Sequence, residues 1–313
     1  MNILVTGCCG FIGYHLVLAL LKKKINVYGI DNLCSVSKKT QNIRLRNLRK
    51  INFKFEKKNL VKKNSLNKFN NIDIDIIIHL AAQPGVRFSQ EYPSKTIDSN
   101  ILAYSNILEF AKKKKVKKIL FASSSSVYGE TKTFRESSPL FKTNSIYAST
   151  KLYNEILSYT YHYLYKINFI AMRFFSVYGP FGREDMAYYK FLKQIEKNKT
   201  ITIYGDLDSM RSYTYIDDVI NKILKLINFK KEKNYFEVFN IGNKNSSKLS
   251  QMIKFYQSNL NKTFTVEKVK RNKSDVLKTV SSNQKFNKYF GKTNNTSLEN
   301  GLSNFLSWYK SIY

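Results

Sequence analysis

The sequence contains few cysteine, proline, glycine and acidic residues. Only three cysteines occur in 313 residues, and Cys8 and Cys9 are neighbours, so neither a disulfide framework nor a metal site is expected. No apolar run approaches the roughly 20 residues that a membrane span needs. No basic segment followed by an apolar one precedes the first strand pattern at Ile3, so no secretory signal is expected. These absences argue against a disulfide-rich secreted domain and a membrane span, and they predict a cytoplasmic protein.

Acidic residues are scarce relative to basic ones. The chain has 22 Asp and Glu against 53 Lys and Arg, a formal net charge of +31. Such a charge is typical of nucleic-acid-binding proteins. The lysines are dispersed, however, as in 22–24 and 112–115, where helices are expected to end. The richness in Lys, Asn, Ile, Phe and Tyr also fits a general drift of composition. We therefore expect no nucleic-acid partner, although the charge can attract an anionic substrate.

What is present is an alternation of β-branched runs with amphipathic stretches. With 43% hydrophobic residues the chain can bury a large core. Strand, helix, strand in regular succession predicts an α/β fold, a Rossmann-like doubly wound parallel sheet. The expected strands are 3–6, 26–31, 52–57, 75–80, 118–123 and 169–174, and the expected helices are 11–23, 39–50, 96–114 and 147–165.

After about Phe175 the rhythm changes and the loops lengthen. We expect a first α/β domain over 1–175 and a smaller α/β substrate domain over 176–313, with 213–242 packing back on the first. The expected helices are 186–197, 216–226, 249–260 and 297–311, and the expected strands are 201–204, 236–241 and 263–269.

The N-terminus carries a glycine loop between a strand and a helix. Gly7, Gly10 and Gly13 permit a tight turn, close approach of a pyrophosphate and close packing of helix on sheet. Asp31 ends the second strand, about 20 residues further on, where a carboxylate binds the ribose hydroxyls of a dinucleotide. That carboxylate would repel a 2′-phosphate. The loop therefore predicts a dinucleotide site that prefers NAD to NADP.

A second group of residues suggests redox chemistry on a hydroxyl. The serines at 123–126 follow the fifth strand, at the end where ligands bind in parallel sheets. Tyr147 and Lys151 are four residues apart on one helical face. The ammonium can lower the tyrosine pKa and make the phenol a general base. With 22 tyrosines and abundant lysine, chance matches to this spacing are also expected.

Together these motifs resemble a known family. The glycine pattern, His79–Ala82, the serines and the Tyr147/Lys151 pair are similar to those of the extended short-chain dehydrogenases/reductases, the NAD-dependent epimerases and dehydratases. The resemblance covers essentially the whole chain. Within that family, several segments resemble the UDP-glucuronate 4-epimerases: Ala81–Arg87, Ala122–Gly129, Arg173–Pro180, Gly182–Met186 and Tyr213–Asp218.

The resemblance implies a role for each residue. Tyr147 would be the acid/base at the sugar 4-hydroxyl, Lys151 would hold the nicotinamide ribose, and Ser124 would hydrogen-bond the same hydroxyl. The implied cofactor-binding set is Gly7, Gly10, Phe11, Ile12, Gly13, Asp31, Asn32, Asn59, Leu80, Ala81, Ala82, Tyr147 and Lys151. The implied substrate-binding set is Pro84, Arg87, Ser125, Ser126, Ser176, Arg183, Tyr204 and Arg211.

Arg183 decides the expected substrate. The resemblance implies that Arg183, assisted by Ser176, clamps the C6 carboxylate of the sugar, and that Arg211 meets the diphosphate. A guanidinium matches a carboxylate in a forked geometry. The alternative for Arg183 is a surface salt bridge with Glu184 or Asp185, and we favour the ligand role.

The serine run decides the expected reaction. Related dehydratases carry an Asp-Glu pair after this strand and decarboxylases a glutamate, whereas only serines occur here. The resemblance thus implies NAD-dependent 4-epimerisation of UDP-glucuronate to UDP-galacturonate for a surface polysaccharide. The steps would be transient oxidation at C4, rotation of the 4-keto sugar and re-reduction. Two alternatives stay open: a 4-epimerase of UDP-glucose or UDP-N-acetylglucosamine, and a catalytically silent dinucleotide-sensing or nucleic-acid-binding protein.

The chain also departs from the family pattern. Asn59 stands where an aspartate is usual near the adenine, and Ser212 follows the diphosphate arginine in place of aspartate. Near the C-terminus, 274–277 resembles a Gly-Asp-Val segment, and Ser282 replaces a later aspartate. The family implies a homodimer built as a four-helix bundle from helices 96–114 and 147–165, with Leu102, Ile107 and Leu157 as candidate contacts.

Overall fold

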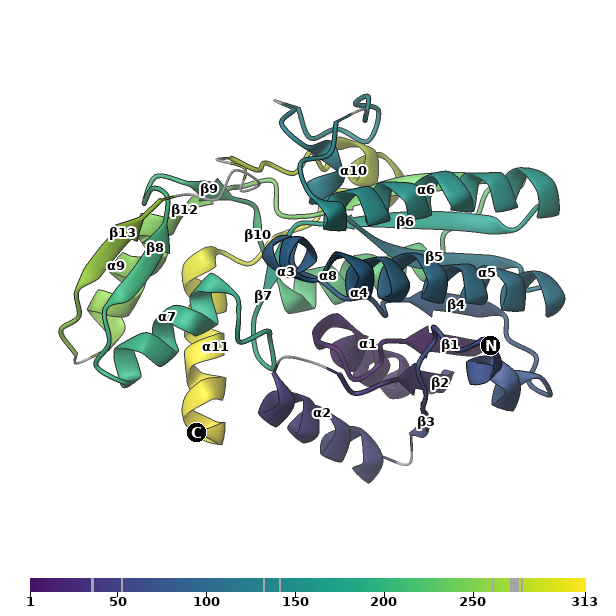
Figure 1. Ribbon diagram of the computed structural model, residues 1–313, viewed down its shortest axis with the longest axis horizontal. Helices are drawn as coiled ribbons and strands as arrows, with labels where there is room; N and C mark the ends of the chain where they lie inside the picture. The colour runs from purple at the N-terminus through teal and green to yellow at the C-terminus, as the bar shows by residue number, and fades with distance from the viewer. Residues whose placement is uncertain are drawn as a thin grey trace.

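A parallel sheet forms the centre of the computed structural model, which describes residues 1–313 apart from 35–36, 52, 132, 141, 261, 271–275 and 277. Its strands are β1 (Asn2–Thr6), β2 (Asn26–Asp31), β3 (Lys54–Lys57), β4 (Ile76–His79), β5 (Lys118–Ser124), β6 (Asn168–Phe174) and β11 (Phe236–Ile241). Their order across the sheet is β11-β6-β5-β4-β1-β2-β3, and every pairing is parallel. The predicted doubly wound α/β fold is confirmed (Figure 1).

Helices cover both faces because successive side chains of a strand point to opposite sides. Ile3 and Val5 of β1 belong to the core cluster under α1 (Phe11–Lys22), α2 (Lys38–Lys50) and α8 (Ile216–Ile227). Leu4 belongs to the cluster on the other face. That face carries α3 (Val86–Glu91), α4 (Pro93–Ile97), η2 (Asp98–Leu102), α5 (Ala103–Lys113) and α6 (Ile146–Tyr165), with the 3₁₀ turns η1 (Lys63–Phe69) and η3 (Ser125–Tyr128) nearby. No helix of the described residues is long and apolar enough to cross a membrane.

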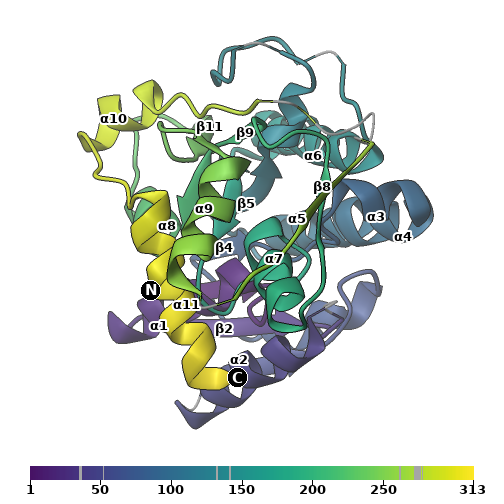
Figure 2. The ribbon, with the colours of Figure 1, turned by 90° about the vertical axis from the view of Figure 1, so that its left-hand side faces the viewer.

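The C-terminal part adds short strand pairs and further helices beside the carboxyl ends of the main strands (Figures 1 and 2). The first core cluster continues from β1 into this part through Tyr189 and Phe305, so the two regions share one apolar core. β11 completes the main sheet by pairing with β6. The remaining elements are β7 (Ser176–Tyr178), α7 (Ala187–Glu196), β8 (Ile201–Tyr204), β9 (Met210–Arg211), β10 (Tyr213–Tyr215), β12 (Ser247–Lys248), α9 (Leu249–Asn259), β13 (Val266–Val269), α10 (Gln284–Phe290) and α11 (Leu298–Ile312).

The predicted single helix over 96–114 is wrong in detail. The helical path begins at Pro93, a residue favoured in the first turn. It then passes through the π-helical turn η2 before α5 starts at Ala103. A π turn inserts one residue into the spiral and re-aims side chains, often at functional sites. Here Asn100 of η2 is fully buried and contacts the segment after β4.

The sheet topology determines where a ligand can bind. From β1 the chain winds to β2 and β3, and then returns to place β4 on the other side of β1. At such a switch point the loops after two neighbouring strands diverge and leave a crevice. The glycine loop follows β1, and the segment from Leu80 follows β4.

Candidate active site

A cavity of about 570 Å³ opens at this switch point. It extends along the carboxyl ends of the strands from β2 to β6. Every residue of the implied cofactor-binding set lines it, as do Ser124 and five of the eight implied substrate-binding residues. Those five are Pro84, Ser125, Ser126, Ser176 and Arg183.

The glycine loop fits a dinucleotide. Gly7 has a φ of +67°, and a Cβ there would lie 2.7 Å from the backbone nitrogen of Ala81, which follows β4. A Cβ on Gly13 would lie 2.1 Å from the Gly7 carbonyl oxygen. Side chains would therefore fill the cradle or push α1 off the sheet. The bare loop leaves the N-terminus of α1, with its free amides and positive partial charge, facing the cavity, where a pyrophosphate can bind.

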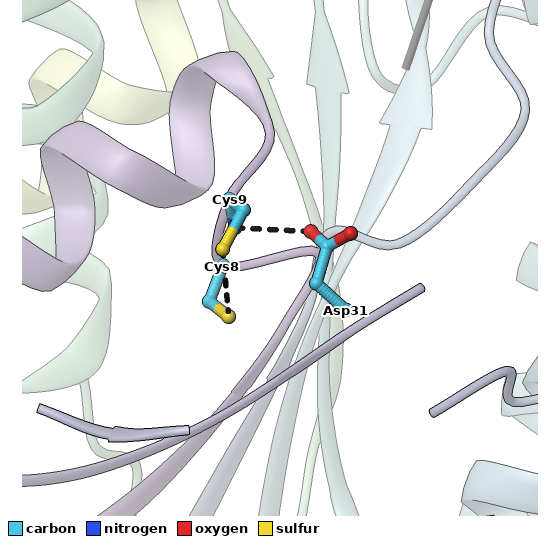
Figure 3. Close-up of side chains that lie close together, drawn as sticks. All are labelled: Cys8, Cys9 and Asp31. Carbon is cyan, nitrogen blue, oxygen red and sulfur yellow. Dashed lines mark hydrogen bonds between the residues drawn. The ribbon is translucent and has the colours of Figure 1, made fainter. Parts of the chain in front are cut away.

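Asp31 ends β2 with its carboxylate directed at the loop (Figure 3). Its oxygens accept hydrogen bonds from the backbone N–H groups of Cys9 (3.0 Å) and Leu33 (2.8 Å). Burial raises the pKa of the carboxyl group, and these backbone hydrogen bonds and the Arg44 charge oppose the rise. Two amide donors leave lone pairs for ribose hydroxyls, so the donor set fits NAD.

The thiols of Cys8 and Cys9 lie beside this carboxylate. Their sulfur atoms are 3.9 Å apart, and the possible metal-ligating atoms of Cys8, Cys9 and Asp31 lie within 4.8 Å of one another (Figure 3). Both thiols are fully buried, and burial raises the pKa of the Cys8 thiol well above its usual value. The expectation that the chain holds no metal remains a prediction.

Tyr147, Lys151 and Ser124 lie together in the lining of the cavity, with the Lys151 Nζ 5.9 Å from the centroid of the Tyr147 ring. The hydroxyl of Ser145 caps α6 by accepting a hydrogen bond from the Ala148 amide, so the helix begins just before Tyr147. Burial raises the pKa of the Tyr147 phenol, so the predicted lowering of that pKa by Lys151 is wrong. The Ser124 hydroxyl and the Arg183 charge act in the lowering direction. Lys151 is buried, which lowers its pKa to about 8, and it donates to the Ala122 carbonyl at 2.9 Å.

The inward face of α6 below Lys151 is polar, and it ties the helix to the sheet. Glu155 accepts two hydrogen bonds from Arg173, at 2.9 and 2.7 Å, and one from the Ser123 hydroxyl at 2.5 Å. Asn100 binds the backbone of Gln83 and the hydroxyl of Thr150. Because buried polar groups need partners, these contacts hold the serine run, the segment after β4 and α6 in one relative position.

Arg183 faces the same cavity and carries an ion pair. Its Nε and Nη2 donate to the two Asp185 oxygens at 3.0 and 2.6 Å. Burial lowers the pKa of the guanidinium, but Asp185 and Tyr147 more than offset this and raise it. The salt bridge that was the alternative interpretation of Arg183 is thus present with Asp185, whereas Glu184 pairs with Lys193. Arg183 nevertheless lines the cavity, with 27% of its side chain exposed.

Three implied substrate residues lie outside the cavity lining. The Arg87 guanidinium stacks 3.8 Å from the centroid of the Tyr204 ring, so these two are brought together. Arg211 donates to the Met210 carbonyl. The residues that depart from the family pattern lie in different places. Asn59 lines the cavity, and Ser212 is buried and donates to the Asn243 carbonyl. The backbone carbonyl of Ser282 accepts a hydrogen bond from the Asn240 side chain. In 274–277 only Val276 is described.

Sequence reasoning missed Arg44, Asn100 and Gln83. Arg44 lies in α2, in a stretch whose basic character suggests a solvated face, yet only 1% of it is exposed. Its spacing from Gln41 and Leu48 places all three on one face of the helix, which is a signal that could have revealed it. Asn100 and Gln83 have no comparable signal, because their contact depends on the π turn.

The fold and the cavity define an NAD-dependent enzyme of the doubly wound α/β class. The model of the NAD dependent epimerase/dehydratase family matches residues 3–242, and the chain belongs to that family.

Three relatives illustrate the similarity. A UDP-glucuronate 4-epimerase of Thermodesulfobacterium geofontis is 38% identical over 98% of this chain and 95% of its own length. A structure of UDP-glucuronic acid 4-epimerase from Bacillus cereus, in complex with UDP-glucuronic acid and NAD, is 33% identical with a TM-score of 0.92 over 100% of both chains. The UDP-glucose 4-epimerase of Thermotoga maritima, solved with UDP-glucose, is 28% identical with a TM-score of 0.88 over 99% of both chains.

Proposed function

We propose that this enzyme interconverts UDP-glucuronate and UDP-galacturonate by epimerisation at C4. The observation that carries the proposal is Arg183, a guanidinium in the same cavity as Tyr147 and close enough to influence the Tyr147 pKa. A neutral sugar gives no reason to place a cation beside the reacting hydroxyl. A C6 carboxylate does, because it can replace Asp185 as the forked partner of Arg183. The UDP-glucuronate 4-epimerases among the relatives support this substrate.

The residues of the site divide the work. Asp31 and the loop from Gly7 to Gly13 would hold the dinucleotide, which when bound would supply the acceptor and donor of a hydride at the sugar carbon. Tyr147 holds or releases the proton of the sugar O4, with Ser124 fixing the direction of that hydroxyl. The run 123–126 contains only serines, so it offers no acidic side chain to assist elimination at C5 or C6 of the sugar. Returning the hydride to the opposite face of the sugar is therefore the outcome that this donor set favours.

A UDP-hexose 4-epimerase is the second candidate. The overall similarity to a structure holding UDP-glucose favours it. In that case the Arg183–Asp185 pair would be a permanent structural contact, and a neutral sugar would be the better substrate.

One experiment separates the two. Purified enzyme is incubated with UDP-glucuronate and, separately, UDP-glucose, and the C4 configuration is followed by proton NMR. We expect epimerisation of UDP-glucuronate without an added external oxidant, because the hydride is recovered in each cycle. Conversion of UDP-glucose alone, or release of CO₂ with formation of a pentose, would contradict the proposal.

Arg183→Ala tests the role of the carboxylate clamp. Hydrogen bonds to a charged group contribute about 1.5–3 kcal/mol, so we expect KM for UDP-glucuronate to rise about ten- to a hundredfold. A 4-keto uronic acid is a β-keto acid, and a free carboxylate can align its C5–C6 bond with the carbonyl π system. CO₂ release per turnover should therefore also rise, as measured with C6-labelled substrate. Unchanged KM and unchanged CO₂ release would remove Arg183 from the substrate site.

We further propose that the enzyme forms a homodimer through α6 and its neighbours, which lie side by side on one face of the sheet (Figure 1). The outward face of α6 exposes Ile156 (60%) and Tyr159 (57%), and Leu102 of η2 is also exposed. Two of the expected contacts are corrected: Ile107 is fully buried, and Leu157 packs against the second core cluster. The side chains of Ile107 and Leu157 point at the sheet. The faces of α5 and α6 that point away from the sheet are therefore the surface available to a second copy of the chain.

The dimer proposal predicts a change of mass. Ile156→Lys places a charge in the centre of the proposed apolar contact, and we expect it to elute as a monomer in light scattering coupled to size exclusion. A wild-type protein that is itself monomeric under the same conditions would contradict the proposal.

A further inference from the structure

The segment 180–184, which carries Arg183, is anchored to the two helices at the cofactor end of the sheet. From α1, His15 donates from Nε2 to the Pro180 carbonyl at 2.9 Å. From α2, Arg44 donates from Nη1 to the Phe181 carbonyl at 2.7 Å. Two hydroxyls at the start of α2 contact Glu184. The Ser37 hydroxyl accepts from the Glu184 amide at 3.0 Å, and the Thr40 hydroxyl donates to the Glu184 carboxylate at 2.8 Å. Anchors thus flank Arg183 on both sides.

The path of this segment is strained and tightly packed. Phe181 has a φ of +55°, in the left-handed region that strains a non-glycine residue. A Cβ on Gly182 would lie 1.6 Å from the Tyr188 hydroxyl. The Phe181 ring packs 4.9 Å from the ring of Tyr14 and 4.8 Å from that of Trp308. A strained backbone persists only where its surroundings over-determine it, so the anchors maintain the conformation that presents Arg183.

Arg44 connects this segment to the dinucleotide site. Its side chain is buried and lines the same cavity as Asp31, and the two charges interact. Burial lowers the pKa of the guanidinium, and the Asp31 charge opposes that shift. Within the described part of the chain its Nε has no hydrogen-bond partner. Arg44 donates to the Phe181 carbonyl in the segment, and its charge interacts with that of Asp31 in the dinucleotide site. It therefore connects the two halves of the cavity.

We propose that His15, Ser37, Thr40 and Arg44 form a latch of positioning residues that fixes segment 180–184 and thereby holds Arg183 at the distance needed to bind a sugar carboxylate. The latch rests on the proposed function for the identity of that carboxylate. It acts through the backbone of the segment and contacts no reacting atom. Its effect should therefore fall on recognition of the carboxylate and leave recognition of the UDP portion intact.

Arg44→Met and Thr40→Val test the latch, with Arg46→Met as the matched control on the exposed side of the same helix. The first measurement is the Kd of UDP-glucuronate and of UDP at saturating NAD. A displaced Arg183 loses its charge-assisted contact with the carboxylate, so we expect Arg44→Met to weaken UDP-glucuronate binding by about tenfold or more while UDP binding is unchanged. Thr40→Val should act in the same direction with a smaller effect, and Arg46→Met should change neither constant.

The second measurement reports on the segment directly. Trp308 is the only tryptophan of the chain and contacts Phe181, so acrylamide quenching of its fluorescence follows the packing of the segment. Quenching should increase in Arg44→Met and Thr40→Val and not in Arg46→Met. Should Arg44→Met fail to fold, Thr40→Val decides the matter alone.

The outcomes separate the latch from the proposed function. Unchanged quenching in the latch variants, or an equal loss of affinity for UDP and UDP-glucuronate, would overturn the latch. Wild-type enzyme that binds UDP-glucuronate no better than UDP would overturn the proposed substrate and the carboxylate role of the latch. In that case the quenching comparison still decides whether these residues hold the segment.

Discussion

Tyr147→Phe is expected to lower the epimerisation rate by about 10²–10⁴-fold, the usual contribution of a positioned acid/base. The phenol lines the cavity together with Ser124 and Arg183, and in the proposed reaction its loss leaves the sugar O4 proton without an acceptor. The ring itself is retained, so the fold should not change, and the affinity for NAD should change far less than the rate. The rate is measured by proton NMR at C4, and the affinity by calorimetric titration with NAD.

The control is a tyrosine on the same helix. Tyr163 of α6 is 67% exposed, and Tyr163→Phe should leave the rate near that of the wild type. A Tyr147→Phe enzyme that retained a rate close to the wild-type value would show that another group moves the O4 proton.

Glu155→Gln is expected to reduce the free energy of unfolding by about 3–5 kcal/mol, because it leaves the Arg173 guanidinium buried without its counter-charge. The side chains of Arg173 and Glu155 are only 4% and 6% exposed. Water cannot compensate the loss at that depth. Urea denaturation of wild type and variant at neutral pH measures the difference.

Two further variants test whether the loss of stability comes from the buried ion pair. Asp208→Asn breaks the exposed ion pair with Lys248, and it should cost less than about 1 kcal/mol because solvent screens the pair. The double variant Glu155→Leu/Arg173→Met should recover part of the stability, because no unpaired charge remains inside. A Glu155→Gln variant as stable as the wild type would mean that the buried pair does not hold α6 to the sheet.

Much of the fold follows from local patterns. β2, β8 and β11 have the expected bounds, and the strand before the glycine loop and the helix after it are correct to within one residue. These elements are readable because strand and helix periods differ and because glycine marks the turn. The helical path from Pro93 to Lys113 was not readable in detail, because the π turn at Asp98–Leu102 depends on packing against α6. The same limit applies to Ile107, whose helical stripe faces the sheet.

Spacing in the chain by itself determined the class of the protein. Three glycines after the first strand, an aspartate at the end of the second and a Tyr/Lys pair on one helical turn act over short distances along the backbone, so their chemistry is legible without coordinates. Only the tertiary structure decided that Arg183 is held by Asp185 within reach of Tyr147, and that Arg44 joins its segment to Asp31. Arg183 and Asp185 are neighbours in sequence, but Tyr147 and Arg44 come from distant parts of the chain. The energies of all these contacts depend on burial, which arises only when the sheet and both sets of helices are assembled.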